Sequence, residues 1–367
     1  MTAASKRIDS LDALRGLAAL AVCWKHLTGS FVLSRVFQVS GMYGWLGVEI
    51  FFVISGFVIP YTLYKSGYGV GQYFTFVWKR IVRLEPPYLV SILFVILIGY
   101  LAAHAPGYHG GPYRPSTAQV LLHFGYLNAF AHYDWLNGVY WTLAIEFQYY
   151  LALGLLFPLL CARNPKARYA ALAVLSVLAF IPSKSLMFQY LFLFLLGIVT
   201  FQHWVKLIGT RVYIGLILVL GSGAVLTLGV LIAIVAVATA CVISFVRFRQ
   251  FAVLKFLGMI SYSLYLVHLP IVYKLSNLAR RVTHGPTQDM LAVLVIFTIT
   301  IMVAYLFYRL VERPSHRWSA RIKYKRAEAP SFAGHEHLPS QLDSGPIIAN
   351  STLKGPAGCS YASASES

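Results

Sequence analysis

Residues 44–64 read GWLGVEIFFVISGFVIPYTLY, and this stretch decides the fold class. A helix that crosses the hydrocarbon core of a bilayer needs about 20 mainly apolar residues. The stretch has that length and carries a single charged side chain, Glu49. It therefore predicts a helix that spans a membrane.

Nine further apolar stretches flank it, and two of them meet at Gly229. We expect spans at about 11–31, 84–103, 140–161, 168–183, 185–204, 212–227, 229–246, 255–276 and 289–311. The chain is 58% hydrophobic and 11% charged, whereas soluble domains are roughly 25% charged. This excludes a soluble globular enzyme, a disordered chain and a coiled coil. We expect an all-α, polytopic membrane protein with about ten transmembrane helices, and a re-entrant or interfacial piece at 118–131.

The 30 Lys and Arg residues indicate how the chain crosses the membrane. With the N-terminus in the cytoplasm, about 21 of them fall in inside segments and about six outside, as the positive-inside rule requires. We therefore expect both termini in the cytoplasm, a transmembrane domain over residues 1–320 and a disordered cytoplasmic tail over 321–367. The same rule accounts for the net charge of +18, so we expect no nucleic-acid partner.

Ionisable side chains interrupt the first apolar stretch, where each costs several kcal/mol and needs a reason. Asp12 can pair with Arg15, three residues later. Arg15 and His26 share a helix face within about 20° and lie about 16 Å apart along the axis. A histidine titrates near neutral pH and is a natural general base. The alternative is a structural histidine that is bonded to a neighbouring helix.

Two carboxylates, Glu49 and Glu146, lie in other predicted spans. At membrane depth a carboxylate must be paired or protonated. These two could balance basic groups of the first span, orient His26 or relay protons. The alternative is a buried ion pair that holds helices together.

The segment SYSLYLVHLP at 261–270 places Ser261, Tyr265 and His268 on one helix face. His268 lies deep in its span, where it could act in catalysis or bind an acceptor. The alternative is a polar seam between helices.

The loop WKRIVRLEPPYL at 78–89 places Lys79, Arg80 and Arg83 just before the third span. They could bind the phosphates of a nucleotide-type donor. The alternative is that they bind anionic lipid or fix the topology. The four cysteines form no CxxC pair, and we expect no metal site.

Six segments occur in a fixed order over roughly residues 7–318. They are RIDSLDALRGLAALAVCWKH, GVEIFFVISGFVI, KRIVRLEPPYLV, YWTLAIEFQYYL, LGMISYSLYLVHLP and YRLVERP. Each segment alone would be weak, but the six together form a specific match. Taken together, they resemble the acyltransferase-3 family of integral membrane O-acyltransferases.

This resemblance implies about ten transmembrane helices in a bacterial inner membrane. It also implies transfer of an acyl group, usually acetyl from acetyl-CoA, to a hydroxyl of a cell-surface or secreted glycan or glycolipid. The family's Arg-x10-His motif maps onto Arg15 and His26. Its other motif residues map onto Lys79, Arg80 and Arg83 in the basic loop, onto Glu146, and onto Tyr262, Tyr265 and His268.

The resemblance also implies roles for these residues. His26 would act as general base or carry the acetyl group, with Asp12 or Glu146 orienting its ring. Arg15 would bind the donor or stabilise the oxyanion, and the basic loop would bind the donor's phosphates. The acceptor would contact a further set of residues, namely Glu49, Tyr265 and His268.

The sequence departs from the family's pattern at two positions. Glu49 stands where Asp is usual, which is a conservative change. Glu85 replaces an aromatic residue beside the basic loop, where a carboxylate would weaken phosphate binding.

The sequence allows more than one acceptor and more than one class of function. The chain is similar in size to rhizobial nodulation proteins that O-acetylate lipochitooligosaccharide signals, so such a glycolipid is one candidate acceptor. The alternative function is a transporter or flippase for a lipid-linked glycan, whose buried charges would form a substrate or proton pathway. The acceptor sugar, the acyl chain length and the oligomeric state stay open.

Overall fold

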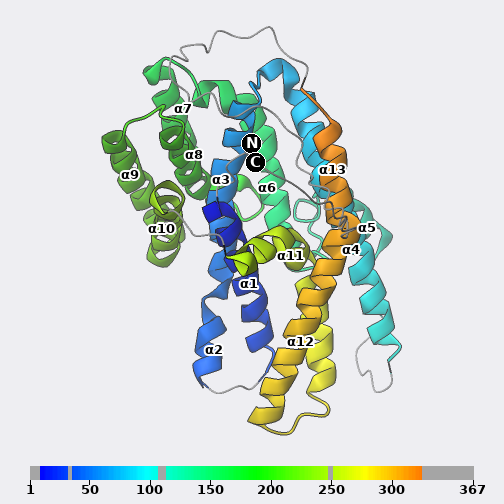
Figure 1. The fold of residues 1–367 in the computed structure, drawn as a ribbon. Coiled ribbons are helices and arrows are strands. Elements are labelled where there is room, and N and C mark those ends of the chain that lie inside the picture. Colours follow the sequence, from blue (N-terminus) through cyan, green and yellow to red (C-terminus); the bar gives the residue numbers. More distant parts are fainter. Residues whose placement is uncertain (1–8, 32–34, 106–112, 247–250, 325–367) are drawn as a thin grey trace, which may run out of the picture. The chain divides into compact units, whose positions relative to one another are not determined.

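The computed structural model describes residues 9–31, 35–105, 113–246 and 251–324. Within these ranges every regular element is a helix and there is no strand, so the predicted all-α class is confirmed (Figure 1). The expectations for residues 1–8 and for the tail beyond residue 324 lie outside the described residues. Tyr324, inside the range expected to be tail, packs with its ring centroid 6.1 Å from that of Tyr68.

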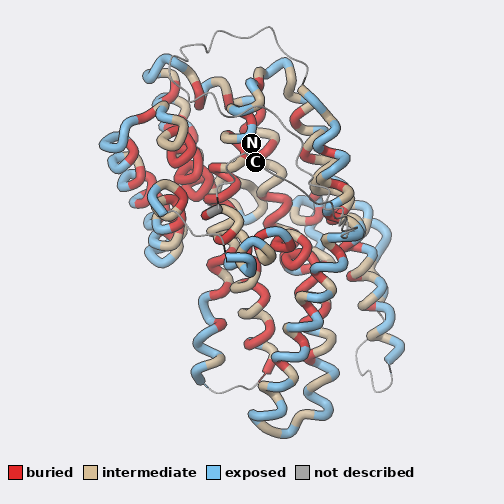
Figure 2. Tube along the Cα trace, in the orientation of Figure 1, coloured by how far each residue is buried: buried red, intermediate tan, exposed pale blue. Residues whose placement is uncertain are grey.

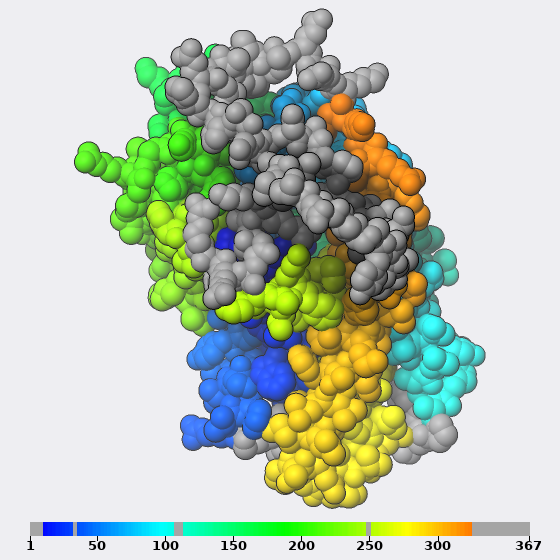
Figure 3. All heavy atoms as spheres, viewed as in Figure 1, coloured from blue at the N-terminus to red at the C-terminus, as the bar shows by residue number. Residues whose placement is uncertain are grey.

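The helices follow one another along the described chain. They are α1 (Asp9–Thr28), α2 (Arg35–Met42), η1 (Gly44–Leu46), α3 (Gly47–Lys65), η2 (Val70–Gln72), α4 (Tyr73–Ala103), α5 (Thr117–Leu122), η3 (His123–Gly125), α6 (Tyr140–Leu160), α7 (Pro165–Leu178), η4 (Met187–Tyr190), α8 (Leu191–Trp204), α9 (Thr210–Leu228), α10 (Val230–Phe245), α11 (Ala252–Ala279), α12 (Pro286–Phe307), the π-helical turn η5 (Tyr308–Glu312) and α13 (Arg313–Arg321). The connection at 126–139, between η3 and α6, is a long one. In the space-filling view α12 lies on the near face (Figure 3).

A helix lies at each of the ten predicted spans, but the count of ten is approximate. Seven helical segments of the described chain are long and apolar enough to cross a bilayer. The other three predicted spans correspond to α1, α7 and α10. The helix α1 carries several charged residues, while α7 and α10 have 14 and 16 residues and are shorter than a bilayer requires.

The basic segment expected to be a loop is part of a helix. α4 begins at Tyr73 and continues through Pro86 and Pro87 to Ala103. Proline removes a helical hydrogen bond, but neighbouring helices can satisfy the freed groups in a membrane protein. The Tyr262 hydroxyl of α11 donates to the carbonyl of Leu84, just before these prolines, at 3.1 Å and so joins α11 to α4.

Glycine pairs allow two helix crossings to be very close. A Cβ atom on Gly16 of α1 would lie 2.8 Å from the backbone nitrogen of Gly258 in α11. A Cβ atom on Gly197 of α8 would lie 2.6 Å from Cα of Gly56 in α3. Small residues at such crossings let helix backbones pack directly. The first crossing fixes α1 against α11, the two helices that carry the site.

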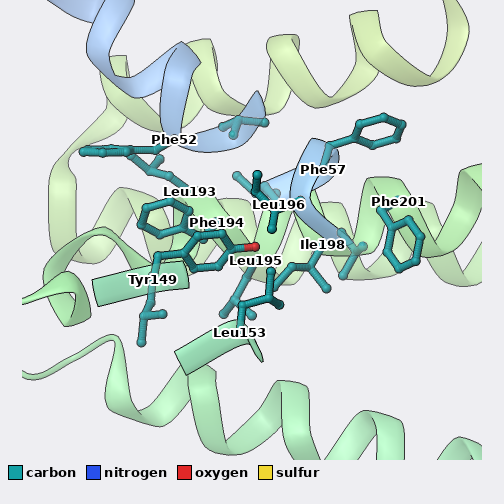
Figure 4. Close-up of a cluster of buried hydrophobic side chains, with 14 of the residues drawn as sticks. Phe52, Phe57, Tyr149, Leu153, Leu193, Phe194, Leu195, Leu196, Ile198 and Phe201 are labelled. Atoms are coloured by element: carbon teal, nitrogen blue, oxygen red, sulfur yellow. The ribbon is translucent and has the colours of Figure 1, made fainter. Parts of the chain in front are cut away.

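Buried side chains form two large clusters. One joins α3, α6 and α8, and Figure 4 shows Phe52, Tyr149 and Phe194 meeting within it. The rings of Tyr149 and Phe194 stack with centroids 4.1 Å apart, and α8 is buried along almost its whole length (Figure 2). The other cluster joins α1, α4, α11 and α12.

Two local expectations concern chain breaks. The predicted split at Gly229 is confirmed, because α9 ends at Leu228 and α10 begins at Val230, with Gly229 at φ 92°. The apolar piece at 118–131 forms the short α5 and η3, and the chain then turns at Tyr126 with φ 57°. Ser116 begins α5 by accepting a hydrogen bond from the Gln119 nitrogen at 3.1 Å.

Candidate active site

The described residues enclose two cavities along the same three helices, α1, α4 and α11. The inner cavity, as we call it, is lined by Arg15 of α1 and Arg83 of α4. The outer cavity is lined farther along these helices by His26 and Gly99. Both cavities also contain residues of α11. Because Arg15 and His26 are eleven residues apart on α1, these two wall positions lie about 16 Å apart along the helix axis.

Three arginines give the inner cavity its charge. Arg15, Arg80 and Arg83 all line it. The guanidinium carbon of Arg80 lies 5.5 Å from the ring centroids of both Phe76 and Tyr150, which is a cation–π arrangement. Helix α3 contributes mostly apolar side chains to the wall, namely Val48, Phe51, Phe52, Ile54, Val58 and Ile59. The inner cavity therefore combines concentrated positive charge with an apolar surface.

Two carboxylates and a histidine also line the inner cavity. Oε1 of Glu146 accepts a hydrogen bond from Ser55 Oγ at 2.5 Å. Oε2 of Glu312 accepts from the backbone nitrogen and Oγ of Ser263 at 3.1 and 2.5 Å. Oε1 of Glu312 lies 3.4 Å from His316 Nε2. Glu312 ends the π-helical turn η5, and such turns are frequent at functional sites.

The outer cavity has a volume of about 800 Å³ and contains His26. Nδ1 of His26 is 3.1 Å from the hydroxyl oxygen of Tyr273, and the two rings meet edge to face with centroids 5.8 Å apart. This hydrogen bond occupies Nδ1. Nε2 is therefore the ring nitrogen left for a hydroxyl group in the cavity.

Two residues of α11 connect the cavities. Tyr265 lines the inner cavity, and its hydroxyl is 2.8 Å from Thr142 Oγ1. The ring centroid of His268 is 5.9 Å from that of Tyr265 and 5.5 Å from that of His26. A row of three rings thus leads from the inner cavity to the outer one.

His268 has an uncommon arrangement for a buried side chain. It is fully buried, and its Nδ1 lies 3.0 and 2.9 Å from the carbonyl oxygens of Leu264 and Tyr265. Carbonyl oxygens only accept, so Nδ1 carries the proton and Nε2 is an acceptor. Among the described residues nothing hydrogen-bonds this Nε2. Such an unsatisfied buried group costs stability and calls for a functional explanation.

The structure divides the predicted site residues between these places. Arg15, Arg80, Arg83, Glu146 and Tyr265 share the inner cavity. His26 lies in the outer cavity with its hydrogen bond to Tyr273, and His268 lies between the two. Glu146 and His26 therefore lie in different cavities, and Glu146 is not placed to orient the imidazole ring through a direct hydrogen bond.

Two residues of the basic segment form hydrogen bonds outside the inner cavity. Nζ of Lys79 donates to the carbonyls of Ser319, at 3.0 Å, and Ile322, and so closes the end of α13. The carboxylate of Glu85 accepts from the Tyr126 hydroxyl at 2.7 Å and does not line the inner cavity. Glu85 therefore lies outside the wall of the inner cavity, and Arg80 and Arg83 remain as the cationic pair of α4 in that wall.

The remaining predicted residues line neither cavity. Glu49 lies buried in the first turn of α3, and its Oε2 has no hydrogen-bond partner among the described residues. It interacts electrostatically with Tyr265. Asp12 lies at the crossing of α1 and α11, where its backbone packs on Gly258.

Sequence reasoning missed Tyr273, Glu312 and His316. Tyr273 follows the SYSLYLVHLP segment by only a few residues, and nothing in the local sequence sets its hydroxyl apart from that of any other tyrosine at a span end. Glu312 sits inside the basic run at the end of α12; a lone carboxylate among arginines was the available signal. Within the described ranges, no group of three His, Cys, Asp or Glu residues could hold a metal ion.

These features define a multi-pass membrane protein with a cationic cavity and a histidine-bearing cavity on one set of helices. Residues 8–309 match the acyltransferase-3 family model, which is described as an acyltransferase domain. The chain belongs to this family.

Curated relatives match parts of the chain. The ORF330 protein of Acidianus two-tailed virus is 30% identical over 146 residues, which is 39% of each chain. The O-acetyltransferase OatA of Staphylococcus aureus is 25% identical over 57% of this chain and 32% of its own length. The peptidoglycan O-acetyltransferase OatA of Listeria monocytogenes is 28% identical over 44% of this chain and 26% of its own. The matches thus span 26% to 39% of these relatives. No solved structure matches.

Proposed function

We propose that the chain is a membrane O-acetyltransferase that moves an acetyl group from acetyl-CoA to a hydroxyl of a cell-surface glycan. The observation that carries this proposal is the placement of Arg15 and His26 on one helix, in two different cavities. A cationic cavity suits a donor with phosphates, and a histidine in a separate cavity suits the activation of a hydroxyl. Family membership and the names of the OatA relatives support the same class of reaction.

The donor would bind in the inner cavity. The guanidinium groups of Arg15, Arg80 and Arg83 are suited to phosphate oxygens, which they can bind in pairs. The apolar wall from α3 suits the chain that links the nucleotide to the thioester. If the phosphates bind near Arg15, the thioester has to reach about 16 Å along α1 to His26. The reaction therefore needs a donor with a long arm between phosphate and thioester, as acetyl-CoA has.

His26 would act on the acceptor. With Nδ1 bonded to Tyr273, Nε2 takes the proton of the acceptor hydroxyl as its oxygen attacks the thioester carbonyl carbon. The carbon–oxygen bond forms, the carbon–sulfur bond breaks, and the imidazolium returns the proton to the departing thiolate. Tyr273, rather than Asp12 or Glu146, would then orient the ring.

Covalent transfer through His26 is the other route at the same residue. In that route Nε2 attacks the thioester carbonyl carbon first, the carbon–sulfur bond breaks and the thiolate leaves. The acceptor oxygen then attacks the acetyl group, the carbon–nitrogen bond breaks, and the hydroxyl proton passes through the freed imidazole to the thiolate. Brief incubation with radiolabelled acetyl-CoA in the absence of acceptor separates the routes. Label that stays on the protein and is lost in His26→Ala supports the covalent route, whereas an unlabelled protein supports general-base catalysis.

The test of the function uses membranes that contain the protein, radiolabelled acetyl-CoA and fractionated glycans. Wild type, His26→Ala and a matched control, His284→Ala, are compared at equal expression. His284 is exposed in the connection between α11 and α12 and lines neither cavity. We expect alkali-labile label in a glycan fraction for wild type and for the control, and loss of most label for His26→Ala. A fully active His26→Ala protein would contradict the mechanism, and label in no fraction would favour transport.

The finer assignments belong to the same proposal. We place the protein in a bacterial inner membrane with both termini in the cytoplasm, a transmembrane domain over 1–320 and a tail over 321–367. The distribution of Lys and Arg supports this orientation. It puts the inner cavity on the side where acetyl-CoA is available. A lipochitooligosaccharide remains one candidate acceptor, and fractionation of the labelled glycans would test it.

A further inference from the structure

We propose that the acceptor of the outer cavity is an anionic glycan, held through a carboxylate or phosphate group by Lys274 and Arg280. This inference rests on the proposed O-acetyl transfer and names the substrate class for the same site. Both basic residues line the outer cavity together with His26.

The charge of the outer cavity carries the inference. Its lining contains Lys274 and Arg280 and includes neither Asp nor Glu. Lys274 is half-buried, while Arg280 is exposed and donates to the side chain of Asn277. A cavity lined by charge of one sign, with low-dielectric walls, concentrates ligands of the other sign.

The carboxylates of the described chain lie elsewhere. Glu146 and Glu312 line the inner cavity, and Glu85 is bonded to Tyr126. Asp134 lies in a segment predicted to face outside, and Asp289 begins the last predicted span; neither lines the outer cavity. No acidic side chain of the cavity wall therefore neutralises its two cations.

These cations also run against the general trend for membrane proteins. Lys and Arg are depleted in loops on the outer side of a membrane, and only about six fall in the predicted outside segments of this chain. Two of these six line the cavity that contains His26. A binding role accounts for that placement, whereas topology alone would disfavour it.

The spacing along α11 suits a sugar. Tyr273 and Arg280 are seven residues apart, so they share a helix face within about 20° and lie about 10 Å apart along the axis. Tyr273 is bonded to His26 and so marks the reacting end. A hydroxyl at His26 and an anionic group at Arg280 would then lie on opposite sides of a sugar ring, with Lys274 between them in sequence. The acidic group is therefore on the acetylated sugar or on its neighbour.

Direct binding to the purified protein tests this without requiring catalysis. The protein is placed in nanodiscs of neutral lipid, and binding is measured for three probes of equal length: a neutral oligosaccharide, one that contains a uronic acid, and one that carries a phosphate. Wild type is compared with Lys274→Gln, Arg280→Gln and a matched control, Lys184→Gln. Lys184 is exposed between α7 and α8 and lines neither cavity.

We expect wild type and Lys184→Gln to bind at least one acidic probe about tenfold more tightly than the neutral one, and each cavity variant to lose most of that difference. The uronic acid and phosphate arms identify the anionic group. Equal binding of all three probes by wild type, or an equal loss in Lys184→Gln, would overturn the proposal. Vesicles of anionic lipid are added as competitor, and displacement by vesicles but not by acidic sugars would assign the cations to lipid headgroups and also overturn it.

Acetyl transfer to the same probes separates this inference from the proposed function. Transfer to acidic and neutral probes with equal KM would leave the O-acetyltransferase standing and remove the anionic acceptor. Selective binding of acidic probes without transfer would support the anionic ligand and contradict the O-acetyltransferase. The cavity variants should raise the KM for the acidic probe more than they lower kcat, and this split should be clearest for Arg280→Gln, since Arg280 lies about 10 Å along α11 from Tyr273.

Discussion

The imidazole rings of His26 and His268 lie 5.5 Å apart, one in an open cavity and the other fully buried. They come from α1 and α11, which meet at the contact of Gly16 with Gly258. Their surroundings give them different chemistry. His26 has a nitrogen available to a ligand, while His268 keeps an unprotonated nitrogen without a partner among the described residues.

Replacing His268 by leucine should separate activity from stability. The change removes a buried acceptor whose burial without a partner costs about 1–3 kcal/mol, so we expect His268→Leu to melt at the same temperature as wild type or higher. We expect its kcat for acetyl transfer to fall by about tenfold or more, because this ring lies between Tyr265 and His26 and its unpartnered Nε2 is an acceptor that a reacting group can use. Thermal unfolding in detergent and labelled transfer measure the two effects. A variant with normal kcat would assign His268 to packing alone.

Replacing Tyr273 by phenylalanine should weaken catalysis without abolishing it. The hydroxyl that bonds Nδ1 of His26 is lost, while the aromatic ring and its edge contact remain. We expect kcat to fall about tenfold, because the imidazole loses the hydrogen bond that fixes its orientation. The KM for acetyl-CoA should not change, since Tyr273 lies outside the inner cavity. A change confined to that KM would contradict this assignment.

The arginines of α4 should differ from their neighbour Lys79. We expect Arg80→Gln and Arg83→Gln to raise the KM for acetyl-CoA by about tenfold or more, because each removes a charged donor to phosphate. Lys79→Gln removes the cap of α13 and should lower thermal stability with little effect on that KM. Donor titrations and unfolding curves on the same three proteins provide the comparison. A large rise in KM for Lys79→Gln would return this residue to the donor site.

The glycine crossings should be sensitive to one added side chain. Gly16→Val and Gly197→Val place atoms where the opposing backbone already lies, so we expect each to destabilise the protein by about 1–3 kcal/mol or more. Gly215 of α9 has nothing within 4 Å of an added Cβ. Gly215→Ala is therefore the matched control, and we expect it to stabilise the protein by about 0.5–1 kcal/mol. Unfolding of all three in one detergent would check the ranking.

Much of the fold was predictable because apolar length and helix breaks are local properties. The span at 44–64 and the break at Gly229 depend on neighbouring residues alone. The start of α4 at Tyr73 was not predictable in this way, because the prolines at 86 and 87 favour a break, whereas the helix continues through both of them. Likewise, the 14 residues of α7 look like part of a longer span in the sequence.

The part of the site that lies on one face of a single helix was predictable. Arg15 and His26 share a face by helix geometry, and the structure places one in each cavity. The partner of His26 was not predictable, because Tyr273 is far away in the sequence and a hydrogen bond across helices leaves no periodic pattern. For Lys79 the sequence and the structure suggest different roles. Its place beside Arg80 indicated a shared role, yet its ammonium group ends at the carbonyls of α13.

The row of rings formed by Tyr265, His268 and His26 has a consequence for where reagents need to travel. Under the proposed function, only the acetyl group and the narrow arm that carries it have to extend along this row, while the nucleotide stays on its own side of the bilayer. The coenzyme could then be reloaded where metabolism makes its thioester, and no export system for it would be required. The glycan, for its part, could be modified after it has already left the cell interior.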